Sequence, residues 1–227
     1  MNQVVNHHRG RAGDLSPDIG RGTTLFVPGY RGSGAGHWQT WMETQVPGAR
    51  RVSGIDWDTP VAAVWAAAIR REIAHAPAPV WLVAHSFGCL AAVLAGSAQP
   101  ERVAGALLVA PADPERFSPT GQCGAAEAAG PSPGGLTPFI PKSPLGFPSL
   151  VIGSRNDPWM ALPRVCRWAR RWGGEFVDLG KAGHVNPDSG FGPWPEGLDL
   201  LHALQVPRGR QSLLAIRARG LRGSLGR

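Results

Sequence analysis

The chain has 227 residues, of which 43% are hydrophobic and 17% charged, a composition typical of one globular domain with a substantial core. It contains no apolar run near the roughly 20 residues of a membrane-spanning helix and no secretion signal at its start, so we expect a cytoplasmic protein without a membrane span. Its net charge of +7 is confined to the two ends, which argues against a nucleic-acid-binding fold.

The distribution of charge divides the chain into three parts. Residues 1–22 are polar and carry a net charge of +1, and residues 206–227 carry six arginines and no acid. We expect both to be disordered tails, the second of them basic. The near-neutral residues 23–205 are expected to form a single domain.

Within this domain, short apolar segments alternate with segments of helical periodicity. Several of the apolar segments have no polar residue, which is typical of strands buried on both faces of a parallel sheet. The alternation predicts an α/β fold in which helices flank a mostly parallel sheet of about six strands. The predicted strands are Thr23–Val27, Arg50–Ser53, Val80–Ala84, Val103–Ala110, Ser149–Ile152 and Glu175–Leu179.

Three helices can be placed between the strands. The first is expected to begin at Pro60, which follows two residues suited to a helix cap. The second is expected to run from Ser86 to about Ala98. The third is expected from about Leu162, with Pro163 in its first turn.

The segment Ala112–Phe147 interrupts the alternation. It is rich in proline, glycine and serine and has almost no periodicity, and it is longer than an ordinary connection in a compact domain. Two interpretations stay open, a disordered insertion and a loop that lies over a functional site. We favour the loop, because long loops in compact domains often cover such sites.

The segment VWLVAHSFGCL places Ser86 between a predicted strand and a predicted helix. In such a strand–serine–helix turn, the serine hydroxyl is raised at the carboxyl edge of the strand, where it can act as a nucleophile. The turn needs small neighbours. Gly88 is one, whereas Ala84 stands where the motif usually has glycine. The alternative interpretation is a serine that only caps the helix.

A serine hydroxyl needs a base within hydrogen-bond reach to act as a nucleophile. Asp157 follows the fifth predicted strand and His184 follows the sixth. Since parallel strands end at the same edge, both can meet Ser86 there, in the order Ser, Asp, His. We therefore predict a catalytic triad of these three residues. Asp113, after the fourth strand, is an alternative acid that we favour less.

A tetrahedral intermediate needs donors for its negative oxygen. We expect these to be the backbone N–H groups of Phe87, next to the serine, and of Tyr30, in the turn after the first strand. Aromatic residues in or near loops at the same edge are candidates for an apolar substrate pocket, with loop packing as an equally good interpretation. They are His37, Trp38, Trp57, Trp159 and Trp194.

The sequence suggests no metal or cofactor. The three cysteines have no C-x-x-C spacing, and no H-E-x-x-H segment occurs. The glycines from Gly32 to Gly36 follow a predicted strand, as in a dinucleotide-binding motif. That motif needs a third small residue where this chain has His37, so we do not expect a dinucleotide cofactor. The expected partner is a small-molecule ester or amide substrate, and nucleic acid is not expected.

Together these motifs resemble the YdeN-like branch of the α/β-hydrolase superfamily, which includes retinoblastoma-binding protein nine. The resemblance spans Thr23 to Leu204 and implies a compact serine hydrolase with little or no cap domain. It also implies a triad on the three residues named above and an esterase or amidase-like activity on small acyl compounds. A protein-binding module built on the same scaffold remains the alternative. The segments that carry the resemblance are Pro28–Arg31, His37–Trp38, Ala84–Cys89, Ala110–Asp113, Ser154–Pro158 and Gly183–Gly197.

Overall fold

The computed structural model describes residues 22–121 and 135–206. The expected tails, 1–22 and 206–227, lie almost entirely outside these residues, so their disorder stays a prediction. Among the described residues, no helix has the length and apolarity needed to cross a membrane.

Six parallel strands form one sheet in the order β2-β1-β3-β4-β5-β6. Each predicted strand is present within two residues of its expected bounds, and the expected α/β fold is confirmed. The central strands have no exposed residue, which explains their continuously apolar sequences. The strands are β1 (Thr24–Val27), β2 (Ala49–Arg51), β3 (Val80–His85), β4 (Val103–Val109), β5 (Ser149–Gly153) and β6 (Glu175–Asp178).

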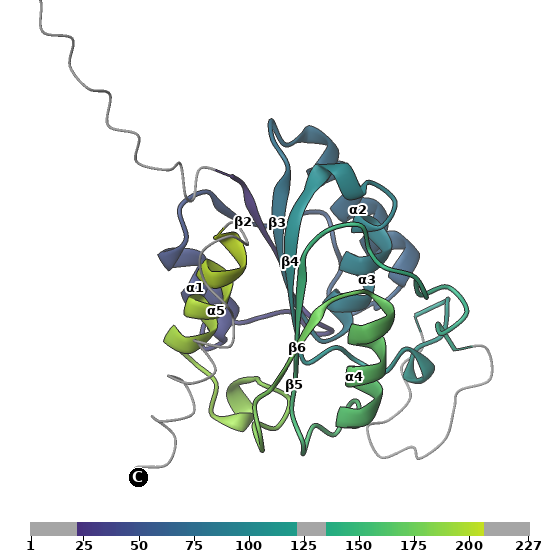
Figure 1. Cartoon of the computed structure of the whole chain (residues 1–227), viewed down its shortest axis with the longest axis vertical. Coiled ribbons are helices and arrows are strands. Elements are labelled where there is room, and N and C mark those ends of the chain that lie inside the picture. The colour runs from purple at the N-terminus through teal and green to yellow at the C-terminus, as the bar shows by residue number, and fades with distance from the viewer. Residues whose placement is uncertain (1–21, 122–134, 207–227) are drawn as a thin grey trace, which may run out of the picture.

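Helices cover both faces of the sheet (Figure 1). On one face lie α1 (Trp38–Gln45) and α5 (Pro195–Gln205), and on the other α2 (Ala62–His75), α3 (Phe87–Gly96) and α4 (Leu162–Arg171). Each layer has its own cluster of buried apolar side chains. Within the two described ranges, no further helical domain covers the edge of the sheet.

The first predicted helix begins two residues later than expected, at Ala62 instead of Pro60. The reason is a turn that precedes it. The carboxylate of Asp56 accepts hydrogen bonds from the N–H of Asp58 (3.0 Å) and the hydroxyl of Thr59 (2.7 Å). The polar residues before the proline therefore bond within their own turn and do not cap α2.

The sequence reasoning missed α1. Its N-cap is His37, whose Nδ1 accepts a hydrogen bond from the N–H of Gln39 (3.1 Å). Trp38 and Met42, four residues apart, are fully buried on the side that faces the sheet. A helix of eight residues offers few such apolar positions, so its period could not be distinguished from that of a loop.

The described parts of the long segment 112–147 join the core. Phe117, Leu136 and Ile140 are buried, and the N–H of Leu136 bonds to the carbonyl oxygen of Phe117 (3.0 Å). The Phe117 ring lies 4.5 Å from that of Phe87, beside the predicted nucleophile. Residues 122–134 lie outside the described residues. Phe117 is thus packed next to the predicted site, and the part that begins at residue 135 is bonded to it through Leu136.

The strand order reverses between β1 and β3, because the chain adds β2 on one side and then returns to add β3 on the other. The loops that leave the carboxyl ends of these two neighbouring strands therefore run in opposite directions. Such a reversal opens a crevice in an α/β sheet, the usual position of a binding site. Ser86 and Tyr30 lie in these two loops.

Candidate active site

Ser86 has an unusual backbone conformation for a residue with a side chain, with φ of 54° and ψ of −126°. Such a conformation is strained and is found mainly at functional sites. Ser86 occupies the N-cap position of α3, but its side chain makes no capping hydrogen bond. Its oxygen lies instead 2.8 Å from Nε2 of His184. The serine is therefore not simply a helix cap.

Two glycines permit the tight turn around the serine. A Cβ at Gly88 would lie 2.6 Å from the carbonyl oxygen of Val27 and closer still to that of Pro28, because α3 starts directly against the end of β1. A Cβ at Gly29 would lie 2.7 Å from that of Ser86. The sequence prediction that small residues must flank the serine thus has its physical reason in the backbone contact between α3 and β1.

Three side chains form one hydrogen-bonded row. The Ser86 hydroxyl donates to Nε2 of His184 (2.8 Å), and the Nδ1–H of the same imidazole donates to both carboxylate oxygens of Asp157 (2.9 and 3.0 Å). The Nδ1 proton follows from its partner, since a carboxylate can only accept, and in a neutral imidazole Nε2 is then the acceptor for the serine hydroxyl. The imidazole is 8% exposed and the carboxylate 1%, so water has almost no access to these two side chains.

Parallel pairing explains why residues so distant in sequence meet. His85 at the end of β3 is paired with Val109 of β4, which is paired with Ile152 of β5. Gly153 is in turn paired with Asp178 of β6. Strands β3, β5 and β6 therefore end at the same edge of the sheet, and the loops that follow them carry Ser86, Asp157 and His184.

The alternative acid is engaged elsewhere. One carboxylate oxygen of Asp113 accepts hydrogen bonds from Nη2 of Arg164 (2.9 Å) and from the backbone N–H of Glu115 (3.0 Å). Asp157, in contrast, is held by the N–H of Trp159 (2.8 Å) in the orientation that faces His184. The structure thus places Asp157, and not Asp113, beside the imidazole.

The turn after His184 is braced by the core. Val185 has a φ of 50°, a strained conformation for a β-branched residue. The carbonyl oxygen of His184 accepts a hydrogen bond from Nε2–H of His85 (2.9 Å), and that of Val185 accepts one from the indole N–H of Trp38 (2.9 Å). These two buried bonds fix the peptide groups on either side of the strained residue.

The polar turn that contains Asp157 is also tied to the histidine loop. The side-chain oxygen of Asn156 accepts a hydrogen bond from the N–H of Gly183 (2.8 Å), and the hydroxyl of Ser154 accepts one from the N–H of Ala182 (3.0 Å). Sequence reasoning missed this role, although the polar turn after β5 was visible. The network sets the distance between the carboxylate and the imidazole.

The expected oxyanion donors lie on the two loops at the strand reversal. In the part of the chain that the structure describes, the N–H groups of Phe87 and Tyr30 donate to no backbone carbonyl. The turn after Tyr30 is fixed by hydrogen bonds from Arg31 N–H to the Trp57 carbonyl (2.8 Å) and from Gly32 N–H to the Gly29 carbonyl (2.9 Å). Their role as oxyanion donors stays a prediction.

A sequence profile of serine hydrolases matches residues 24–203. The chain belongs to the serine hydrolase family. A YdeN-like hydrolase from Pectobacterium atrosepticum has 39% sequence identity over 81% of this chain and 90% of its own, with a TM-score of 0.70. The resemblance to YdeN-like hydrolases is therefore confirmed. Among curated protein sequences, none matches.

More distant structures share the fold of this serine hydrolase. The ydeN gene product from B. subtilis is 20% identical, with a TM-score of 0.60 over 81% of this chain and 98% of its own. Est1E from Butyrivibrio proteoclasticus, whose structure contains ferulic acid, is 12% identical, with a TM-score of 0.56 over 81% of this chain and 86% of its own. The protein is a hydrolase of the α/β-hydrolase superfamily.

The structure separates the five aromatic residues proposed for the pocket of this hydrolase. Trp159 is half-buried, with its ring 5.8 Å from that of His184, and Trp57 is half-buried beside the turn after β1. These two remain candidates. His37, Trp38 and Trp194 are buried in the layer of α1 and α5, with their rings against one another or against His85, which favours the packing interpretation for these three.

Two further histidines lie behind the site. The ring of His85 is 4.9 Å from that of His184 on one side and 4.9 Å from that of His37 on the other. Burial, assisted by the charge of Arg51 and the proximity of His184, lowers the pKa of His37 to about 4. Burial likewise lowers the pKa of His85 well below its usual value. Both rings are therefore neutral at pH 7, and neither places a cation beside the catalytic base candidate.

The lowered pKa of His37 makes stability depend on pH. The unfolded chain binds a proton near pH 6.5, whereas the folded protein does so only near pH 4, so acidification in this window favours unfolding. His37→Asn, which keeps an acceptor at the N-cap of α1, should reduce the loss between pH 6.5 and 4 by about 2–3 kcal/mol. Urea unfolding at half-unit pH steps measures it.

The same experiment contains its control. His75 is exposed at the end of α2, and His75→Asn is the matched control for the removal of an imidazole. Part of the change in unfolding free energy with pH should persist in His37→Asn, because the pKa of His85 is also lowered by burial. If both variants follow the wild-type curve, the assignment of this pH dependence to His37 is wrong.

No metal site enters this description. Within residues 22–121 and 135–206, no group of three or more His, Cys, Asp or Glu side chains is arranged to hold a metal ion.

Proposed function

We propose that this hydrolase cleaves a small ester or amide through an acyl-enzyme intermediate on Ser86. The observation that carries the proposal is the continuous row from the serine oxygen through the His184 imidazole to the Asp157 carboxylate, with distances of 2.8 and 2.9 Å. A hydroxyl bonded to a neutral imidazole, which is bonded to a buried carboxylate, is the arrangement that activates serine for acyl transfer.

In the proposed reaction, His184 takes the proton of Ser86 as the serine oxygen attacks the substrate carbonyl. The N–H groups of Phe87 and Tyr30 stabilise the negative oxygen of the tetrahedral intermediate. The imidazolium then gives its proton to the leaving alcohol or amine. Water, activated by the same imidazole, attacks the acyl-enzyme and releases the acid.

The surroundings of the row fit this cycle. Asp157 stabilises the transient imidazolium and keeps the proton of the neutral ring on Nδ1. The neutral His85 does not oppose the charge that develops on His184. The half-buried ring of Trp159, which stacks 6.1 Å from the buried ring of Phe117, provides apolar surface beside the imidazole. This surface supports a small acyl group and a carboxylesterase or amidase-like preference.

The alternative is a protein-binding module on a hydrolase scaffold. Binding alone gives no reason to keep a strained serine in contact with a base, or to hold that base by the bonds of His85 and Trp38. The two functions differ in one chemical property, the nucleophilicity of the Ser86 oxygen.

A fluorophosphonate probe measures this property. We expect the full-length protein to gain one adduct, located by peptide mass spectrometry on Ser86, and to lose hydrolysis of short p-nitrophenyl esters. Ser86→Ala should show neither reaction, whereas Ser53→Ala, which changes an exposed serine, should behave as wild type. Folded wild-type protein that takes up no probe and hydrolyses no ester in a panel of short and long acyl groups would favour the binding module.

A further inference from the structure

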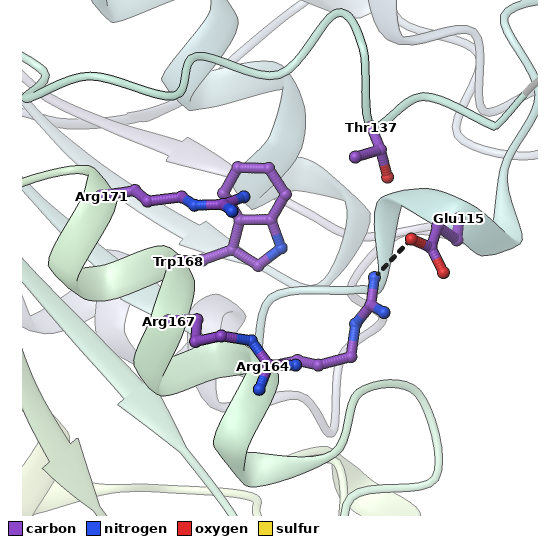
Figure 2. Close-up of a pocket in the computed structure, with 6 residues that line it drawn as sticks. All are labelled: Glu115, Thr137, Arg164, Arg167, Trp168 and Arg171. Atoms are coloured by element: carbon purple, nitrogen blue, oxygen red, sulfur yellow. Dashed lines mark ion pairs between the residues drawn. The ribbon is translucent and has the colours of Figure 1, made fainter.

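A polar cavity of about 220 Å³ lies between α4 and the segments that carry Glu115 and Thr137 (Figure 2). It does not include any member of the Ser86 row, and no comparison assigns it a role. The residues that line it are Glu115, Thr137, Arg164, Arg167, Trp168 and Arg171.

The wall that α4 contributes is strongly basic. The helix has four arginines in ten residues and no acid, and three of them, at positions 164, 167 and 171, lie on one side by helical spacing. Arg164 is neutralised by the carboxylates of Asp113 (2.9 Å) and Glu115 (3.0 Å). Within residues 22–121 and 135–206, Arg167 and Arg171 form no ion pair, so no carboxylate of this part of the chain offsets their positive charges.

One of these two arginines is held in place. The Arg171 guanidinium lies over the ring of Trp168, 5.1 Å from its centre (Figure 2). The indole is buried, and its contact with the cation restricts a side chain that would otherwise be free in solvent. A guanidinium restricted in this way loses less entropy when it binds a ligand.

The cavity wall also contains unused hydrogen-bond donors. The hydroxyl oxygen of Thr137 and Nε of Arg164 are buried and have no hydrogen-bond partner among the described residues. Buried polar atoms are normally paired, and leaving one unpaired is unfavourable. The Nε–H group can only donate, and a hydroxyl can donate as well. Among the described residues, neither atom has an acceptor within hydrogen-bond distance.

We propose that this cavity binds a small oxyanion, as free phosphate or as the phosphate group of a small organic molecule. Arg167 and Arg171 would donate charge-assisted hydrogen bonds to its oxygens, and the Thr137 hydroxyl would donate a further one. The carboxylate of Glu115 stays paired with Arg164, and its negative charge disfavours a second anionic group in the cavity. The role is binding and not catalysis, since the only carboxylate of the wall is in an ion pair.

The site is connected to the proposed active site through one segment. Asp113, which is bonded to Arg164, donates its backbone N–H to the carbonyl oxygen of Trp159 (3.3 Å). Phe117, four residues on, packs against Phe87 next to the nucleophile. The cavity is thus lined by Glu115 of a segment whose Phe117 packs beside the proposed nucleophile.

The test uses full-length Ser86→Ala protein, so that its result does not depend on turnover. Isothermal titration with inorganic phosphate, at ionic strength kept constant with sodium chloride, should give saturable binding at one site. The double substitution Arg167→Gln and Arg171→Gln should weaken it at least tenfold. Titration with glycerol 3-phosphate is the second arm, and tighter binding than that of phosphate would identify an organic phosphate as the source.

Arg170→Gln is the control for the loss of an arginine from α4. It removes one positive charge, where the double variant removes two, at an exposed position that does not line the cavity. It should leave phosphate binding within a factor of two. No saturable binding, or an equal loss in the Arg170 variant, would overturn the proposal. Either outcome leaves probe labelling of wild-type Ser86 unaffected, so the two proposals fail separately. Equal thermal unfolding midpoints confirm that the variants are folded.

Discussion

Asp157→Asn is expected to lower kcat for ester hydrolysis by about 10⁴-fold with the fold intact. The wild-type carboxylate accepts the Nδ1–H of His184 with both oxygens and leaves Nε2 free to accept the serine proton. The amide of asparagine would donate to Nδ1 and place the imidazole proton on Nε2. The base would then carry a proton where it needs a lone pair.

Single-turnover and steady-state kinetics on a p-nitrophenyl ester measure the effect, and the thermal midpoint checks the fold. Asp113→Asn is the control, because Asp113 is the other acid after a neighbouring strand and bonds to Arg164. Its kcat should stay within a factor of a few of wild type. A large loss in Asp113→Asn together with a small one in Asp157→Asn would show that the acid had been assigned wrongly.

Gly88→Ala is expected to destabilise the protein by more than about 3 kcal/mol. The added methyl group would lie 2.6 Å from the carbonyl oxygen of Val27 and would overlap that of Pro28. Both atoms belong to backbone that is fixed by the sheet, so no side chain can move aside. Helix α3 would have to shift away from β1 and would take Ser86 with it.

Urea unfolding gives the loss of stability. Gly36→Ala is the matched control, since a Cβ there meets no atom within 4 Å, and its effect should be within about 0.5 kcal/mol. Ester hydrolysis and probe labelling of Gly88→Ala should fall with the folded fraction or further. A Gly88→Ala protein as stable as Gly36→Ala would contradict the close contact between α3 and β1.

The sheet could be predicted from sequence because of how it is buried. Residues Leu25–Val27 of β1 and Leu150–Ile152 of β5 are fully buried, so these stretches are apolar without interruption. Their sequences therefore differ from the periodic sequences of the helices around them. The short α1 lacked such a signal. The start of α2 was predicted wrongly, because the Asp56 side chain forms a local turn with residues that look like a helix cap.

The row of Ser86, Asp157 and His184 could be predicted because its members follow parallel strands, and parallel strands end together. The residues that hold this row could not. Which face of the sheet receives Trp38 is decided by packing in three dimensions, and periodicity does not contain that information. Likewise, the bond from His85 to the His184 carbonyl joins residues 99 positions apart.

The hydrogen bond from the Trp38 indole to the Val185 carbonyl joins one helical layer to the loop that carries His184. Trp38 belongs to the layer of α1 and α5, whereas Ser86 precedes α3 in the layer on the other face of the sheet. The proposed turnover would therefore depend on the packing of both layers against the sheet. We expect heating that loosens only α1 and α5 to lower ester hydrolysis before the sheet itself unfolds.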